Sequence, residues 1–159
     1  ASARLIAKAA LPPEVYAHTL RVVERIKGDT VEVLMPRRMY YEIVVAYLHD
    51  VLEDSDLLLA DLIDYGFDGL TVDAVEVLTR HELVTYAEYI ERVKHFGGVA
   101  KAVKIADLED HLAEADTLKP SLKGRYEKAL AILTDTEGDE RFADWSPETI
   151  TIGRYPERR

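Results

Sequence analysis

The spacing of apolar residues along the chain is typical of helices. "PEVYAHTLRVVERIKG" begins with a proline that a first helical turn accepts, and it ends at Gly28. The next predicted helix, "RRMYYEIVVAYLHDVLED" over residues 37–54, is unusually apolar in its middle. We therefore expect the second of these helices to be largely buried.

The rest of the chain continues the helical pattern. "DLLLADLIDYGF" is amphipathic and stops at Gly66, and "TVDAVEVLTR" begins with Thr71, a residue type that caps helices. Thr85 and Glu88 form a predicted capping box. The remaining predicted helices are "TYAEYIERVKHFGG", "VAKAVKIADLEDHLAEA" and "SLKGRYEKALAIL".

Sustained alternation of period two appears only in the short "TITIG" near the end, so the predicted fold class is all-α. We expect one helical domain over residues 1–133 and an irregular tail over residues 134–159, where charge, Gly and Pro become frequent. Trp145 and Tyr155 are candidates to anchor this tail on the domain or to contact a second subunit. A homo-oligomer is therefore one of the alternatives.

Composition excludes several classes of protein. With 159 residues and 48% apolar side chains, the chain is expected to fold around a real core. Its net charge of −10 argues against a general nucleic-acid or anionic-membrane binder. The absence of cysteine excludes disulfides, thiol catalysis and zinc–thiolate sites. No apolar run suits a membrane span or a secretory signal, so we expect a soluble, cytoplasmic protein. An acidic protein that acts on phosphate needs a metal ion or a local basic pocket.

The stretch "YLHDVLEDSD" concentrates ionisable side chains after an apolar run. On one continuous helix, His49 would share a face with Glu53, and Asp50 would share a face with Glu53 and Asp54. Buried charges persist mainly when they pair with each other or hold a metal. The alternative is a solvated, acidic helix end.

Two further residues on other predicted helices have the chemistry of metal ligands. His18 borders the apolar face of its helix, and Asp107 lies beside an apolar stripe. The alternatives are a hydrogen-bonded core histidine and a local pair of Asp107 with Lys104. Two imidazoles and two carboxylates form a mixed N/O donor set, which suits manganese, iron, zinc or similar divalent ions.

The order His18, His49-Asp50, Asp107 resembles the signature of the HD phosphohydrolase superfamily. "YLHDVLEDSD" is similar to the "LLHDxxEDT" segment of the Rel/SpoT hydrolase domain and the small alarmone hydrolases, and "AVKIADLEDHL" is similar to their "VKLADxxxN" segment. The resemblance covers roughly residues 14–133 and implies an HD-type helical bundle.

By position, the resemblance implies that His18, His49, Asp50 and Asp107 ligate one divalent metal, by analogy Mn²⁺. Glu53 and Asp54 match the catalytic pair that orients or deprotonates the attacking water. The implied substrate is a small phosphorylated nucleotide, with removal of the 3′-pyrophosphate of guanosine tetra- or pentaphosphate as the first hypothesis. The implied phosphate contacts include Arg125 and Tyr126.

The chain departs from the family pattern at two points. The relatives' "RKxGxPYxxHP" segment is reduced to "LPPEVYAH", with no basic residue between Lys8 and His18, and the family's Asn is replaced by His111. For His111 we predict a substrate contact, with a spare metal ligand and an exposed histidine as the alternatives. Arg21 and Lys104 are further predicted substrate contacts. Other candidate cations are Arg37, Arg38, Arg80, Lys119 and Lys123.

Three other functions stay open at this point. The first is an HD phosphohydrolase for a deoxynucleoside triphosphate, a nucleoside monophosphate or the 2′-phosphate of NADPH, which the shortened amino-terminal segment favours. The second is a degenerate HD domain that binds a nucleotide without hydrolysing it. The third is a plain helical interaction domain, which would carry no stoichiometric divalent ion.

Overall fold

The apolar faces of the helices pack on one another and leave a polar cavity between them. The computed structural model describes residues 2–30 and 34–135, in which helices are the regular elements and no strand occurs. This confirms the all-α fold class. The helices are α1 (Ala3–Ala10), α2 (Pro13–Lys27), α3 (Arg37–Leu48), α4 (Val51–Asp54), α5 (Leu59–Asp64), α6 (Gly69–Leu78), α7 (Tyr86–Phe96), α8 (Gly98–Ala113), a 3₁₀ turn η2 (Ala115–Thr117) and α9 (Pro120–Thr134).

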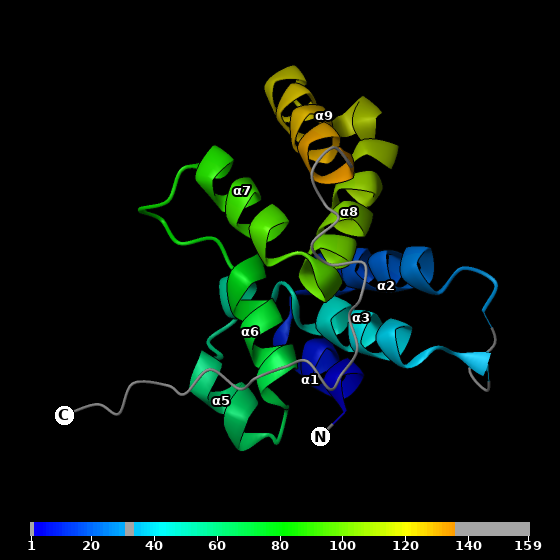
Figure 1. The fold of residues 1–159 in the computed structure, drawn as a ribbon, viewed down its shortest axis with the longest axis vertical. Helices are drawn as coiled ribbons and strands as arrows, with labels where there is room; N and C mark the ends of the chain where they lie inside the picture. The colour runs from blue at the N-terminus through cyan, green and yellow to red at the C-terminus, as the bar shows by residue number, and fades with distance from the viewer. Residues whose placement is uncertain (1, 31–33, 136–159) are drawn as a thin grey trace.

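Three helices form the centre of the molecule. α8 packs against both α2 and α3, and α2 packs against α3, as Figure 1 shows. Their shared core contains Val22, Leu48, Val103 and Leu108, none of which is exposed to solvent. Burial of these apolar side chains is the main favourable term in folding, and it fixes the three helices next to one another.

A second group of helices closes the other side of the cavity. α7 and α9 pack against each other and against α8, while α6 contacts α7 and α8 (Figure 1). The phenol of Tyr89 on α7 donates to the carbonyl of Leu78 at 2.7 Å, and Arg92 donates to the carbonyl of Thr79 at 2.8 Å. These bonds satisfy carbonyls at the end of α6 and tie α7 to it.

Helix α1 has no counterpart among the predicted elements. It packs on α3, with Ala3 and Ala7 buried and Leu11 closing the contact just beyond its end. The apolar residues of "ARLIAKAAL" fall four positions apart, and they provide one narrow buried stripe.

The predicted single helix over residues 37–54 is wrong. α3 ends at Leu48 and α4 begins at Val51, with His49 and Asp50 between them. The Nδ1–H of His49 donates to the carbonyl of Ala46 at 2.7 Å, which is the acceptor that the Asp50 amide uses in a continuous helix. The histidine side chain thus competes for the backbone bond where the helix is interrupted.

Of two predicted helix caps, the one at the start of α7 is confirmed and the one at the start of α6 is wrong. The Thr85–Glu88 capping box is confirmed: the Glu88 carboxylate accepts from the Thr85 amide at 2.9 Å, and Thr85 Oγ1 accepts from the Glu88 amide at 3.2 Å. The expected start at Thr71 is wrong, because Asp68 caps α6 by accepting from the Thr71 amide at 2.8 Å. Thr71 is buried inside the helix.

The turn between α7 and α8 depends on glycine. Gly97 and Gly98 have φ values of 67° and 50°, a region that side chains with a Cβ rarely adopt. This turn sets the start of α8 and hence the position of Asp107. Residues 136–159, with "TITIG", Trp145 and Tyr155, lie outside the described residues. In the described part of the chain, no helix has the length and apolar character needed to cross a membrane.

Candidate metal centre

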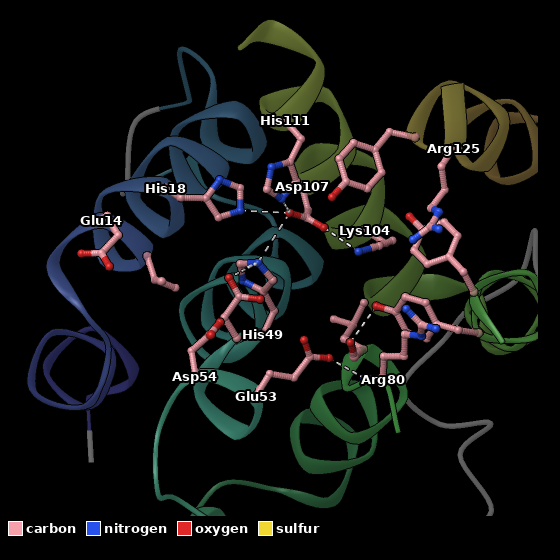
Figure 2. A pocket seen from close by; sticks show the side chains of 16 residues that line it. Glu14, His18, His49, Glu53, Asp54, Arg80, Lys104, Asp107, His111 and Arg125 are labelled. Carbon is pink, nitrogen blue, oxygen red and sulfur yellow. Dashed lines mark hydrogen bonds and ion pairs between the residues drawn. The ribbon is translucent and has the colours of Figure 1, made fainter. Parts of the chain in front are cut away.

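The four predicted metal ligands lie together where α2, α3 and α8 meet (Figure 2). The Nε2 atom of His18 lies 2.9 Å from Oδ1 of Asp107, and Nε2 of His49 lies 3.8 Å from the same oxygen. Asp50 completes the group, with Oδ2 at 3.1 Å from Nε2 of His49. His18, His49 and Asp107 are buried, although two of them are titratable imidazoles and the third is a carboxylate.

The orientation of His49 is fixed by the backbone. Its Nδ1 must carry the proton, because the partner of Nδ1 is the Ala46 carbonyl, which only accepts. The other nitrogen, Nε2, is buried and has no hydrogen-bond partner among the described residues. A buried ring nitrogen beside carboxylates, where a metal ion can take the place of a proton, is the arrangement of a histidine metal ligand.

The orientation of His18 is fixed by a carboxylate that the sequence analysis did not select. Its Nδ1 lies 2.8 Å from Oδ2 of Asp110, and Asp110 also accepts from Arg21 Nε at 3.0 Å and from Arg25 Nε at 3.1 Å. Asp110 is only 1% exposed, so its charge needs these partners. A signal was present in the sequence, because Asp110 is one helical turn after Asp107 and so shares its side of α8.

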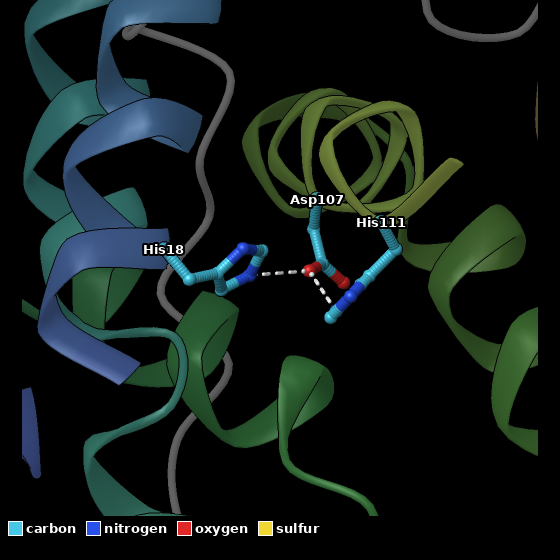
Figure 3. A group of neighbouring side chains, drawn as sticks. All are labelled: His18, Asp107 and His111. Carbon is cyan, nitrogen blue, oxygen red and sulfur yellow. Dashed lines mark hydrogen bonds and ion pairs between the residues drawn. The ribbon is translucent and has the colours of Figure 1, made fainter. Parts of the chain in front are cut away.

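His111 joins the cluster at the same oxygen. Its Nε2 lies 3.2 Å from Oδ1 of Asp107, and its ring stacks on that of His18 with 4.5 Å between centroids (Figure 3). His18, Asp107 and His111 form one group of ligand atoms close enough to share a cation, and His18, His49 and Asp50 form another. The two groups meet at His18.

The pKa values of the clustered side chains depend strongly on one another. Burial disfavours the charged form of Asp107, but the Lys104 ammonium 2.7 Å away and the surrounding imidazoles outweigh it and hold its pKa well below the ordinary value. Burial likewise lowers the pKa of His18 and His49, but neighbouring carboxylates outweigh burial and raise both pKa values. The centre of the cluster therefore attracts positive charge, which either protons or a divalent cation can supply.

The donor set fits a divalent cation. Adjacent ligands of an octahedral ion, with bonds of about 2.1 Å, lie about 3 Å apart. The separations of 2.9, 3.1 and 3.2 Å in this cluster agree with that value and also with hydrogen bonds, while the separation of 3.8 Å between His49 and Asp107 is longer. The Nε2 of His49 would gain a metal ion as its partner, and the Nδ1–H of His49 would keep the Ala46 carbonyl as its acceptor.

Glu53 and Asp54 lie beside the cluster, on α4. The Glu53 carboxylate accepts a hydrogen bond from the backbone N–H of Arg80, which holds it at the cavity edge. Burial raises the pKa of Glu53, although the Arg80 amide partly offsets this effect. Burial and the charge of Asp50 raise the pKa of Asp54. A carboxylate of raised pKa next to a cation site is suited to accept a proton.

The cluster opens into a cavity of about 400 Å³. Of the predicted substrate contacts, Lys104, His111, Arg125 and Tyr126 line it, and the Tyr126 ring stacks on His111 with 5.2 Å between centroids. Arg21 does not line this cavity and lies behind His18, paired with Asp110.

The cavity wall also contains side chains that the sequence analysis did not assign to the site. They are Glu14, Tyr86, Tyr89 and, from the wider group of candidate cations, Arg80. The tyrosines occur in the helical pattern of α7, where aromatic residues are indistinguishable from core residues until their neighbours are known.

Comparisons with known proteins add no family to this picture. No protein-family model matches the chain, and no curated protein matches it.

Proposed function

We propose that this chain is a metal-dependent phosphohydrolase of the HD type that acts on a phosphorylated nucleotide. The observation that carries the proposal is the convergence of imidazole nitrogens on one buried carboxylate oxygen. His49 commits Nδ1–H to the Ala46 carbonyl and His18 places Nδ1 on Asp110, while both rings turn Nε2 toward Asp107 Oδ1. A core histidine needs only one satisfied partner, so this arrangement favours ligation over a structural role.

In this proposal, His18, His49, Asp50 and Asp107 hold one divalent ion, with manganese as the first candidate. The ion would lower the pKa of a bound water and neutralise charge that develops on the phosphoryl group. Lys104 keeps Asp107 ionised, because its ammonium neutralises the second carboxylate oxygen. His111 is a candidate for a further ligand or for a contact to the substrate.

Glu53 is our candidate for the group that takes a proton from the attacking water. Its raised pKa allows the carboxylate to accept a proton during the reaction and to release it afterwards. The Arg80 amide restricts its rotation, which reduces the entropy lost on reaching a reactive geometry. Asp54 would orient the water from the opposite side.

For the substrate, we propose guanosine tetra- or pentaphosphate, with hydrolysis of the 3′-pyrophosphate. The support is the resemblance of "HDVLED" and "VKIAD" to alarmone hydrolases, together with cations on the cavity wall. A specific observation favours a second candidate, another HD phosphohydrolase activity. The chain lacks the basic pair that the relatives carry before the first histidine, and Glu14 lines the cavity at the start of α2, where a carboxylate repels phosphate.

The first experiment is metal analysis of the purified protein, followed by assay of the manganese-loaded protein with guanosine tetraphosphate. We expect about one divalent ion per chain, and release of pyrophosphate and guanosine diphosphate. Asp107→Ala is expected to lose both the ion and the activity, whereas Asp64→Ala, an exposed aspartate on α5, should keep both.

Absence of a stoichiometric ion in the wild-type protein would contradict the metal centre and favour a plain helical domain. A bound ion without pyrophosphate release would contradict the alarmone substrate. The same assay with deoxynucleoside triphosphates, nucleoside monophosphates and NADPH then tests the second candidate.

A further inference from the structure

A second cavity, of about 690 Å³, lies between α1, α2 and α3, beside the turn that leads into α6. It shares no lining residue with the cavity of the metal centre. Tyr40, Tyr41, Tyr47 and Phe67 give it an aromatic wall, and we call it the tyrosine cavity. Its volume is in the range of about 300–1,000 Å³ that ligand-binding cavities have.

Positive side chains without an ionic partner border the tyrosine cavity. Arg4 and Lys27 line it, and the guanidinium carbon of Arg37 lies 5.9 Å from the centre of the Tyr41 ring. Within residues 2–30 and 34–135, no carboxylate forms an ion pair with any of these three cations. In a chain of net charge −10, unpaired cations beside aromatic rings favour an occupant that is both acidic and aromatic.

Two acidic residues also line the tyrosine cavity. Asp68 accepts from the Thr71 amide at 2.8 Å and caps α6, so its carboxylate is already used by the fold. Glu24 forms no ion pair in the described part of the chain, and its carboxylate can accept a hydrogen bond. An aromatic ring with an N–H at its edge would supply that donor.

Tyr40 marks the opening of the tyrosine cavity. The residue is 59% exposed, and its ring lies edge-on to that of Tyr41 with 5.9 Å between centroids. Exposed apolar surface that borders a cavity is typical of a contact site.

One segment of this chain has the matching chemistry. "EGDERFADWSPE", residues 137–148, contains five carboxylates, one arginine and the rings of Phe142 and Trp145. It lies outside the described residues and follows the end of α9. Between Asp135 and Trp145, an extended chain spans about 34 Å, at about 3.4 Å per residue. The radius of gyration expected for a domain of this size is about 14 Å, so the segment is long enough to cross the neighbouring helices.

We propose that residues 137–148 dock in the tyrosine cavity of the same chain, with Trp145 among the tyrosine rings. The indole would bury a large apolar area and donate its N–H to Glu24 or to a tyrosine hydroxyl. The carboxylates beside it would face Arg4, Lys27 and Arg37, which have no ionic partner among the described residues. Docking is independent of the proposed hydrolase activity, because the two cavities have no lining residue in common.

Tryptophan fluorescence of the full chain tests the docking, because Trp145 is the only tryptophan. We expect wild-type emission at clearly shorter wavelength than in the urea-unfolded protein, and weaker quenching by acrylamide. Arg4→Glu combined with Lys27→Glu should repel the acidic segment and shift the emission to the unfolded value. Far-UV circular dichroism checks that the helices of each variant are retained.

The matched control is Lys8→Glu combined with Lys128→Glu. It makes the same change of net charge at exposed positions that do not line the tyrosine cavity, and it should leave the emission unchanged.

A charge swap separates docking from an indirect effect on the fold. Asp144→Lys combined with Glu148→Lys reverses the charges on both sides of Trp145, and it should release the indole in the wild-type background. Together with Arg4→Glu and Lys27→Glu, the same two changes should restore the short-wavelength emission. No rescue is expected if the two cations only stabilise α1 and α2.

Three results would overturn the proposal. The first is wild-type emission equal to that of the unfolded protein, and the second is short-wavelength emission that the cavity variants leave unchanged. The third is short-wavelength emission that is lost on dilution while light scattering shows a dimer, since the segment would then occupy the cavity of a second copy. Release of Trp145 by both pairs of changes without rescue would overturn the assignment of Arg4 and Lys27 as its charge partners.

Discussion

At one end of the cavity, Asp107 is 3% exposed and contacts His18, Lys104 and His111, whereas at the other end Arg125 is exposed and lies against the Tyr86 ring. The first end is held by side chains from three helices that also form the core. The second is built from long side chains that reach over the surface. The difference teaches that the buried end is part of the fold, whereas side chains at the exposed end can change without disturbing the fold.

The largest expected difference between the two ends is in how much a substitution at each lowers the free energy of unfolding of the protein. In EDTA, we expect Asp107→Asn to lower the free energy of unfolding by about 3 kcal/mol, because it leaves the Lys104 charge without its partner. Arg125→Gln should change it by no more than about 0.5 kcal/mol, as for most surface substitutions. Urea denaturation gives both values, and equal losses in the two variants would remove the distinction.

Substitution of Glu53 tests whether the proposed hydrolysis can be slowed without loss of the bound metal. We expect Glu53→Gln to slow hydrolysis about 10²- to 10⁴-fold, the usual contribution of a general base, with metal content unchanged. Glu91→Gln, an exposed change on α7, is the control. Because burial raises the pKa of Glu53 and the carboxylate is the active form, wild-type activity should fall as the pH drops through this raised pKa. Loss of the metal in Glu53→Gln would place Glu53 among the ligands instead.

Substitution of Asp110 tests whether a residue that only contacts a proposed metal ligand also affects metal affinity. Asp110→Asn keeps the size of the side chain but weakens its bond to His18 Nδ1 and leaves Arg21 and Arg25 without a charge partner. We expect manganese affinity to fall about 10- to 100-fold, and activity to return at high manganese concentration. Asp116→Asn, on the exposed η2 turn, should have no effect. Unchanged affinity in Asp110→Asn would limit the centre to its direct ligands.

Tyr89 lies between the two ends, and we expect its substitution to have only a modest effect on stability at neutral pH. Tyr89→Phe removes a hydrogen bond to the Leu78 carbonyl, which is worth about 1 kcal/mol. Burial raises the pKa of Tyr89 to about 12, compared with about 10 in an unfolded chain. The protonated phenol therefore contributes stability that is fully present below pH 10 and is lost as the pH rises toward 12.

Urea denaturation at several pH values between 9 and 12 measures this contribution. The wild-type protein should lose more stability over this range than Tyr89→Phe does. Parallel curves for the two proteins would mean that the phenol titrates equally in the folded and unfolded states.

Local sequence was enough to predict most features that depend on near neighbours in the chain. The Thr85–Glu88 capping box is such a case, since both partners lie within one helical turn. The pair of Lys104 with Asp107 and the position of His111 one turn later follow from the same periodicity. Where two local solutions compete, as at Asp68 and Thr71, the sequence alone pointed to the wrong cap.

Features that depend on distant partners were not predictable in this way. Asp110 is meaningful only because α2 brings His18, Arg21 and Arg25 to it. For the same reason Arg21, expected in the cavity, lies behind it: one carboxylate on α8 decides which way the guanidinium turns. Arg80 and Tyr86 join Arg125 only after α6, α7 and α9 pack together.

The sequence by itself determined the all-α class, most helix positions and the identity of most of the clustered histidines and aspartates, with Asp110 as the exception. These follow from hydrophobic periodicity and from the high cost of burying charges that have no partner. Tertiary structure alone decided the interruption at His49 and Asp50, the orientation of the two imidazoles and the division of the cavity into an acidic and a basic end. The physical reason is that a helix fixes only which side chains share its face, while packing against other helices decides what each face meets.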